Sequence, residues 1–65
     1  MTIADKIVEL RKRAGYTQAD LAKLLNVDQS AVSQWERGKV KPLKKILPAM
    51  AQALNCTVDD LQADR

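Results

Sequence analysis

Amide and hydroxyl side chains gather between residues 29 and 34. On an α-helix, which advances about 100° per residue, they would share one face with a single cation. That face comprises Gln29, Ser30, Ser33, Gln34 and Arg37. A glutamine carboxamide can donate and accept together at adenine N6 and N7, and a serine hydroxyl can do either at a base edge. The pattern therefore favours a helix that reads base edges; an ordinary solvated helix face is the alternative interpretation.

Basic residues are distributed unevenly along the chain. Residues 1–46 contain ten basic and five acidic side chains, whereas residues 47–65 contain one basic and three acidic ones. The segment 37–45 has five cations and no anion, namely Arg37, Lys39, Lys41, Lys44 and Lys45. A surface that needs only solubility usually intersperses both signs. The cationic segment therefore indicates a polyanionic partner, with a merely solvated surface as the alternative.

The composition excludes several classes of protein. The 65 residues include no His and one Cys, Cys56, so no zinc cage, Cys–His pair or internal disulfide can form within the chain. A chain of this size also has little room for an active-site cleft. We therefore expect no enzyme, metal, cofactor or small-molecule ligand. No apolar run approaches the ~20 residues that span a bilayer, and no apolar signal core follows Met1. We expect one domain over residues 1–65, in the cytoplasm and away from membranes.

Helix start and stop signals predict an all-α fold of four to five helices. Thr followed three residues later by Asp, the pattern of a capping box, begins at residues 2, 17 and 57. Asp28 is expected to cap a further helix, while Gly15 and Asn26 tolerate the left-handed conformation that ends one. Pro48 fits only the first turn of a helix, which places that start near Leu47. The predicted helices cover residues 2–14, 17–25, 28–37, 47–54 and 58–63.

Two of these helices, 17–25 and 28–37, are separated by a turn of only a few residues. Helices that cross steeply over such a turn need a small residue where their backbones approach, and Ala22 lies there. Apolar residues that would close the shared core are Leu21, Leu25, Val27, Val32 and Trp35. This arrangement is typical of a helix-turn-helix unit.

The segments 16–22 (YTQADLA) and 32–38 (VSQWERG) resemble the Cro/C1-type helix-turn-helix family of phage repressors and bacterial regulators. The similarity extends from Leu10-Arg11 through Pro42 to Asp60-Leu61, and thus covers nearly the whole chain. It implies a compact lambda-repressor-like bundle of five helices. It also implies sequence-specific binding to a double-stranded DNA operator by a transcriptional regulator, more often a repressor, that works as a homodimer.

Individual positions take their expected roles from this resemblance. The residues that match base-reading positions are Gln29, Ser30, Ser33 and Gln34. The residues expected to contact DNA phosphates are Arg11, Thr17, Gln18, Arg37, Lys39, Lys41 and Lys44. Arg11 also matches, with Glu36, a pair that joins the first helix to the end of the third. Ala22, Trp35 and Glu36 are expected to be structural, with neither Trp35 nor Glu36 touching a base.

Departures from the family pattern leave some points open. Asn26 stands where the turn usually has Gly, and residues 43–46 lack the Ser or Thr cap that often follows the proline. The dimer surface is expected in the C-terminal region, where Leu61 or Val58 would remain exposed. An alternative function is an antitoxin or another protein-interaction module in which DNA binding serves autoregulation.

Overall fold

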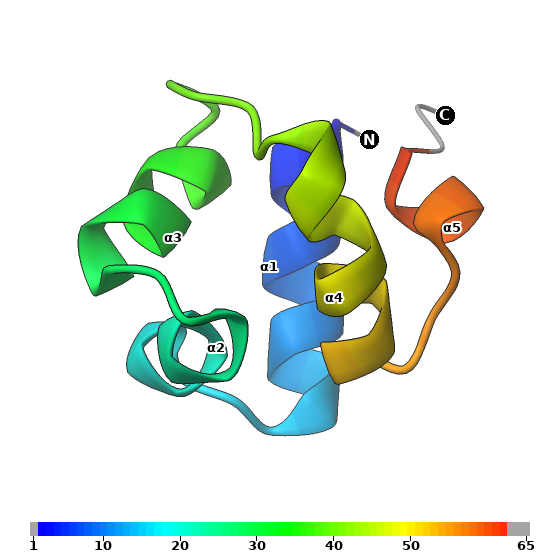
Figure 1. Cartoon of the computed structure of the whole chain (residues 1–65), viewed down its shortest axis with the longest axis horizontal. Helices are drawn as coiled ribbons and strands as arrows, with labels where there is room; N and C mark the ends of the chain where they lie inside the picture. The colour runs from blue at the N-terminus through cyan, green and yellow to red at the C-terminus, as the bar shows by residue number, and fades with distance from the viewer. Residues whose placement is uncertain (1, 63–65) are drawn as a thin grey trace.

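The structure, a computed structural model, describes residues 2–62. Its elements follow one another in the order α1 (Ile3–Ala14), α2 (Gln18–Leu25), α3 (Gln29–Glu36), the 3-10 turn η1 (Lys44–Ile46), α4 (Leu47–Ala53) and α5 (Val58–Gln62) (Figure 1). Within that range there is no strand. The prediction of an all-α fold with four to five helices is confirmed.

Three helix starts are built by the same local device. The Thr17 hydroxyl accepts a hydrogen bond from the Asp20 backbone N–H at 3.0 Å, and the Asp20 carboxylate accepts one from the Thr17 N–H at 3.0 Å. The same reciprocal pairs form between Thr2 and Asp5 and between Thr57 and Asp60. Bonds from the Thr17 backbone and side chain lower the pKa of Asp20. Because the capping residue lies outside the helix, α1 and α2 begin one residue later than predicted.

Helix α3 differs from the prediction at both ends. Asp28 occupies the N-cap position with extended backbone angles, but its side chain makes no capping hydrogen bond, so the expected side-chain cap is wrong. Arg37 follows α3 as its C-cap rather than forming its last turn. The polar face is therefore carried by two turns of helix, Gln29–Glu36.

Residues with left-handed backbone conformation follow α1 and α2 at the predicted positions. Gly15 follows α1 with φ 83°, and Asn26 follows α2 with φ 57°. Asn is one of the few non-glycine residues that adopt this conformation readily, which explains how the turn forms without Gly. Asn55, with φ 58°, follows α4 in the same way.

The segment between α3 and α4 contains an element that the sequence did not predict. Residues 44–46 form the 3-10 turn η1, which Leu43 precedes in extended conformation without a side-chain cap. Pro48 lies in the first turn of α4, as predicted. Helix α4 ends at Ala53, one residue before the predicted boundary. The described part of α5 ends at Gln62, and residue 63 of the predicted helix lies outside the described residues.

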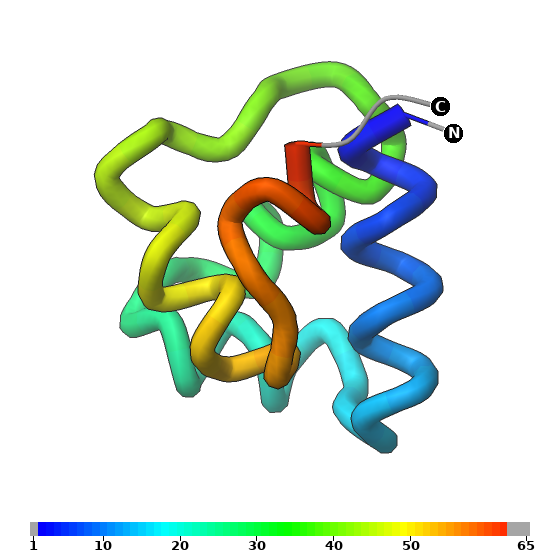
Figure 2. Tube along the Cα trace, turned by 90° about the vertical axis from the view of Figure 1, so that its right-hand side faces the viewer, coloured from blue at the N-terminus to red at the C-terminus, as the bar shows by residue number. Residues whose placement is uncertain are grey.

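All five helices contribute to one hydrophobic core. Its fully buried side chains are Ile7, Leu21, Val32, Met50 and Leu61. Helix α5 packs against both α4 and α1 and thereby closes one side of this core (Figure 2).

Helix α5 buries one of the two residues that were expected to be exposed at a dimer surface. Leu61 has no exposed surface and Val58 is half-buried, so the prediction that Leu61 remains exposed is wrong. The large apolar residues exposed within the described range are Leu24, Val40 and Leu43. Between residues 2 and 62 no helix has the length and hydropathy to cross a membrane.

Candidate nucleic-acid interface

Helix α3 packs against α2 through buried apolar residues, including the small residue Ala22. Residues 26–28 join the two helices, and the Val27 N–H donates to the Ala22 carbonyl at 2.9 Å. Ala22 is buried, as are Val32 and Trp35 on the inner side of α3. Because these residues fix one side of α3 against the core, the helix must turn its opposite side outward.

The outer side of α3 carries the residues predicted to read bases. Gln29, Ser30 and Gln34 are exposed, and Ser33 is half-buried beside them. Helix α3 lies at one edge of the bundle, with α2 next to it and α5 on the far side (Figure 1). No hydrogen bond within residues 2–62 engages these four side chains. Their donors and acceptors are therefore available to an external partner.

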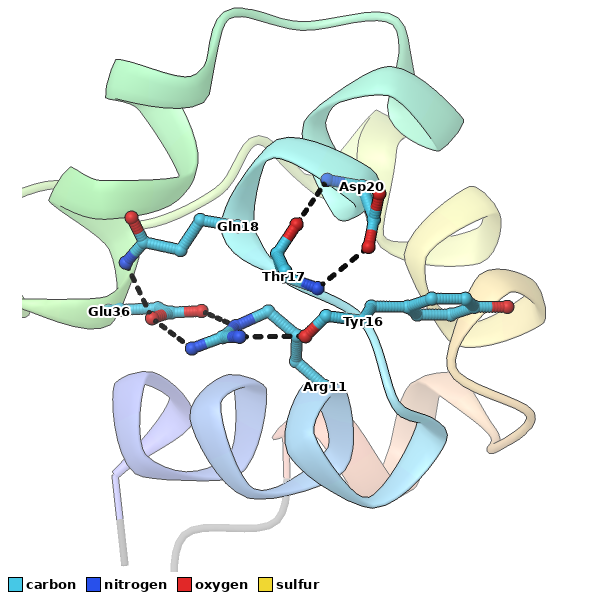
Figure 3. A network of polar contacts seen from close by, with 6 residues as sticks. All are labelled: Arg11, Tyr16, Thr17, Gln18, Asp20 and Glu36. Carbon is cyan, nitrogen blue, oxygen red and sulfur yellow. Dashed lines mark hydrogen bonds and ion pairs between the residues drawn. The ribbon is translucent and has the colours of Figure 1, made fainter.

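A cluster of three polar side chains joins α1, α2 and the last residue of α3 (Figure 3). The Glu36 carboxylate accepts bonds from Arg11 Nε at 2.5 Å and Arg11 Nη2 at 3.1 Å. It also accepts a bond from Gln18 Nε2 at 2.8 Å, while Arg11 Nη1 donates to the Tyr16 carbonyl at 2.8 Å. Only 11% of the Arg11 side chain and 7% of the Glu36 side chain are exposed. The Arg11–Glu36 ion pair is thus nearly buried, and together with Gln18 it links α1, α2 and α3. We call these three side chains the clamp.

Gln18 is the first residue of α2, so this clamp brings the N-terminus of α2 beside the C-terminal end of α3. The first backbone N–H groups of a helix lack intrahelical partners and carry partial positive charge, which suits a phosphate. The Thr17 side chain is exposed at the same end, with its oxygen already accepting from Asp20. The structure therefore brings Thr17 and Gln18 together at one end of the polar face.

The cationic segment begins at the same end of α3, where Arg37 directly follows Glu36. Its members Arg37, Lys39, Lys41, Lys44 and Lys45 are all exposed. None of them forms an ion pair with an acid among residues 2–62. The segment leads from the end of α3 along the top of the molecule to η1 (Figure 1). Unneutralised positive charge thus flanks the uncharged polar face.

The predicted site residues differ in their exposure and in whether they already bond to protein groups. Four predicted base-reading residues share the outer side of α3, and the lysines and Arg37 are exposed beside it. Arg11 is instead held by protein acceptors, and only 11% of its side chain is exposed, so it is less available to a phosphate than the exposed lysines and Arg37. The bond between Gln18 and Glu36 was not predicted, because it joins residues 18 positions apart in sequence.

The described residues contain no group of three or more His, Cys, Asp or Glu side chains arranged to hold a metal. Cys56 is partly buried, and this burial raises the pKa of its thiol.

Comparison with known proteins identifies this arrangement. Residues 7–61 match the family model described as helix-turn-helix. The chain belongs to this helix-turn-helix family. The match covers most of the sequence, and the resemblance to Cro/C1-type regulators is confirmed.

The curated proteins that this chain resembles include a repressor and an activator of transcription. DicA, a transcriptional regulator of Escherichia coli (strain K12), is 42% identical over 57 residues, which cover 88% of this chain and 42% of DicA. Repressor protein C2 of Salmonella phage P22 is 37% identical over 59 residues, covering 91% of this chain and 27% of C2. The transcriptional activator BcrR of Enterococcus faecalis is 34% identical over 61 residues, covering 94% of this chain and 30% of BcrR. The chain thus spans less than half the length of each of these relatives.

A solved structure shows the same helix-turn-helix fold. The P22 c2 repressor, crystallised with the synthetic operator 9T in the presence of Tl⁺, superimposes with a TM-score of 0.90 at 35% identity. The alignment covers 95% of this chain and 94% of the repressor chain in that crystal. The fold of residues 2–62 is therefore that of a phage repressor DNA-binding domain.

Proposed function

We propose that this chain is a sequence-specific double-stranded DNA-binding transcriptional regulator that lays α3 in the major groove. The observation that carries the proposal is the outer side of α3. It presents free carboxamides and hydroxyls, exposes no acid between Gln29 and Gln34, and is flanked by unpaired cations. Family membership and the operator complex of the P22 c2 repressor support the same function.

Base recognition is assigned to Gln29, Ser30, Ser33 and Gln34. The two exposed glutamines suit bidentate bonds to adenine N6 and N7, and the serine hydroxyls suit either donors or acceptors on a base edge. We expect Gln29 and Gln34 to determine sequence preference, because each bidentate pair is worth about 1–3 kcal/mol of discrimination.

Phosphate contacts are assigned to two groups of residues that meet at the C-terminal end of α3. Thr17 and Gln18 would bind one phosphate together with the free N–H groups of α2, and the remaining contacts would come from Arg37, Lys39, Lys41 and Lys44. These contacts position the protein without selecting a sequence. Arg11 would support them through Glu36 rather than as a main contact, since its guanidinium is held by protein acceptors.

A single subunit of this size reads one half-site, so we propose that a homodimer binds a near-palindromic operator with half-sites about 10 bp apart. Binding would repress transcription by occluding the polymerase. The site of action would be the bacterial or phage-infected cytoplasm, where the operator DNA lies.

Selection of bound sequences from random duplexes tests the proposal. The wild-type chain is expected to enrich one near-palindrome. Gln29→Ala is expected to lose preference at one base pair of each half-site, whereas Lys41→Ala is expected to weaken all sequences alike.

Matched controls separate these effects from general damage. Gln52→Ala removes an exposed glutamine from α4, and Lys23→Ala removes an exposed lysine from α2 that lies in a groove with Tyr16 and Asp20. Both controls should bind as the wild type does. Failure of the wild-type chain to enrich any sequence would refute the proposed function, and equal loss of preference in Gln29→Ala and Lys41→Ala would refute the separation of base and phosphate contacts.

A further inference from the structure

Glu36 is an acid in a region that we assign to DNA binding, where an isolated negative charge would be repelled by phosphates. Its carboxylate accepts two hydrogen bonds from Arg11 and only 7% of its side chain is exposed. The Arg11 charge therefore balances it at close range. What remains is a fixed hydrogen-bond acceptor between the end of α3 and the start of α2.

This acceptor determines how the Gln18 carboxamide is turned. An ionised carboxylate only accepts hydrogen bonds, whereas a carboxamide has a donating nitrogen and an accepting oxygen. Gln18 must therefore direct its nitrogen towards Glu36, and Nε2 lies 2.8 Å from Oε1. In Figure 3 the Gln18 oxygen points away from Glu36. A neutral side chain at residue 36 would not impose this orientation.

The nitrogen of Gln18 keeps a second hydrogen after it has bonded to Glu36. That hydrogen has no acceptor among residues 2–62. Gln18 is the first residue of α2, directly after the exposed Thr17, and this helix start also carries backbone N–H groups without intrahelical partners. These donors together suit the oxygens of one phosphate.

We propose that Glu36 is a positioning residue for DNA binding: with Arg11 behind it, it fixes the Gln18 carboxamide so that the second N–H of Nε2 donates to a backbone phosphate. The inference rests on the proposed function and adds to it a contact that depends on a residue touching no DNA. The contribution of Gln18 to affinity then requires the Glu36 carboxylate.

A double-mutant cycle tests this dependence. Operator affinity is measured for the wild type, Gln18→Ala, Glu36→Gln and the double variant, with folding checked by circular dichroism and thermal melting. Gln18→Ala is expected to weaken binding about tenfold per bound subunit, the loss of one hydrogen bond to a charged group. Glu36→Gln is expected to lose a similar factor, because a neutral carboxamide leaves the orientation of Gln18 undetermined. The double variant should bind no more weakly than the weaker single variant.

A second cycle controls for a merely structural effect. Lys41 is exposed, lies in the cationic segment and has no hydrogen bond to this cluster, so the effects of Lys41→Ala and Glu36→Gln should multiply. Independent, multiplying losses for Gln18→Ala and Glu36→Gln would overturn the inference, as would wild-type affinity of Glu36→Gln. If the wild type bound no duplex in preference to random DNA, the proposed function itself would fail.

A measurement on the wild-type chain keeps the inference testable if Glu36→Gln does not fold. The side-chain amide of Gln18 gives two proton signals in a nitrogen-15 correlation spectrum, one for each N–H. The signal bonded to Glu36 should stay in place when operator is added, and the other should shift downfield. Absence of that shift in a saturated complex would overturn the inference.

Discussion

Replacing Arg11 by methionine should destabilise the fold strongly, because it leaves the Glu36 carboxylate almost buried without its cation. Arg11→Met keeps much of the apolar stem of the side chain and removes three hydrogen bonds, two to Glu36 and one to the Tyr16 carbonyl. Gln18 would then be the sole side chain of the described residues still bonded to Glu36.

The expected loss follows from the burial of the pair. Removing one partner of a buried ion pair costs about 3–5 kcal/mol. A domain of this size has a free energy of unfolding of about 3–10 kcal/mol, at roughly 0.05–0.15 kcal/mol per residue. With about 4–8 °C of melting temperature per kcal/mol, even a 3 kcal/mol loss lowers the midpoint by about 12–24 °C.

Urea and thermal unfolding followed by circular dichroism measure this loss, and a second ion pair of the same chain provides the control. Arg13 Nη2 lies 3.1 Å from Glu9 Oε1, but 71% of the Arg13 side chain and 40% of the Glu9 side chain are exposed. Arg13→Met should therefore cost at most about 1 kcal/mol. The double variant Arg11→Met/Glu36→Leu removes both buried charges and should recover part of the stability lost in Arg11→Met. Equal losses for Arg11→Met and Arg13→Met, or a double variant less stable than Arg11→Met, would refute the reasoning.

Four further predictions concern the caps, the turn and the DNA surface. Thr17→Ala should lower the free energy of unfolding by about 1 kcal/mol in urea titrations. The pKa values of Asp20 and Asp60 are both lowered from the ordinary value of 3.8. The contribution of these carboxylates to the stability of the fold is therefore complete above pH 3.8 and is lost as the pH falls through the lower pKa of the folded state. The acid unfolding curve of Asp20→Asn should therefore be flatter below pH 3.8, and an unchanged curve would contradict this assignment. Asn26→Ala should cost about 1 kcal/mol at its left-handed backbone, whereas the control Gln52→Ala, at an exposed helical position of α4, should melt as the wild type does. With four assigned cations per subunit, log affinity of the dimer should fall with log salt at a slope of about −7, and Lys41→Ala should reduce that slope by about 2.

Local signals in the sequence were sufficient for most helix boundaries. Thr17 and Asp20 are three residues apart, and their reciprocal bonds need nothing beyond the first turn of α2. Asn26 similarly needs only its own backbone preference to end that helix. Asp28 shows the limit of such reasoning, because a residue suited to capping still made no capping bond.

Features that depend on packing between distant segments could not be predicted in this way. The burial of Leu61 follows from the packing of α5 on α1 and α4, which no local pattern around residue 61 reveals. The turn η1 has no capping side chain from which its start could be predicted. Gln18 was expected to contact phosphate, but its bond to Glu36 becomes visible only once α2 and α3 are placed together.

Substitution of a single atom in the operator tests the central claim, that the outer side of α3 reads base edges in the major groove. The selection experiment identifies the adenine whose preference is lost in Gln29→Ala, and this adenine is replaced by 7-deazaadenine, which lacks the N7 acceptor but pairs normally. The wild-type chain should lose about 1–3 kcal/mol of binding free energy on the altered duplex. Gln29→Ala should bind the two duplexes equally. Unchanged wild-type affinity for the 7-deazaadenine duplex would contradict the account.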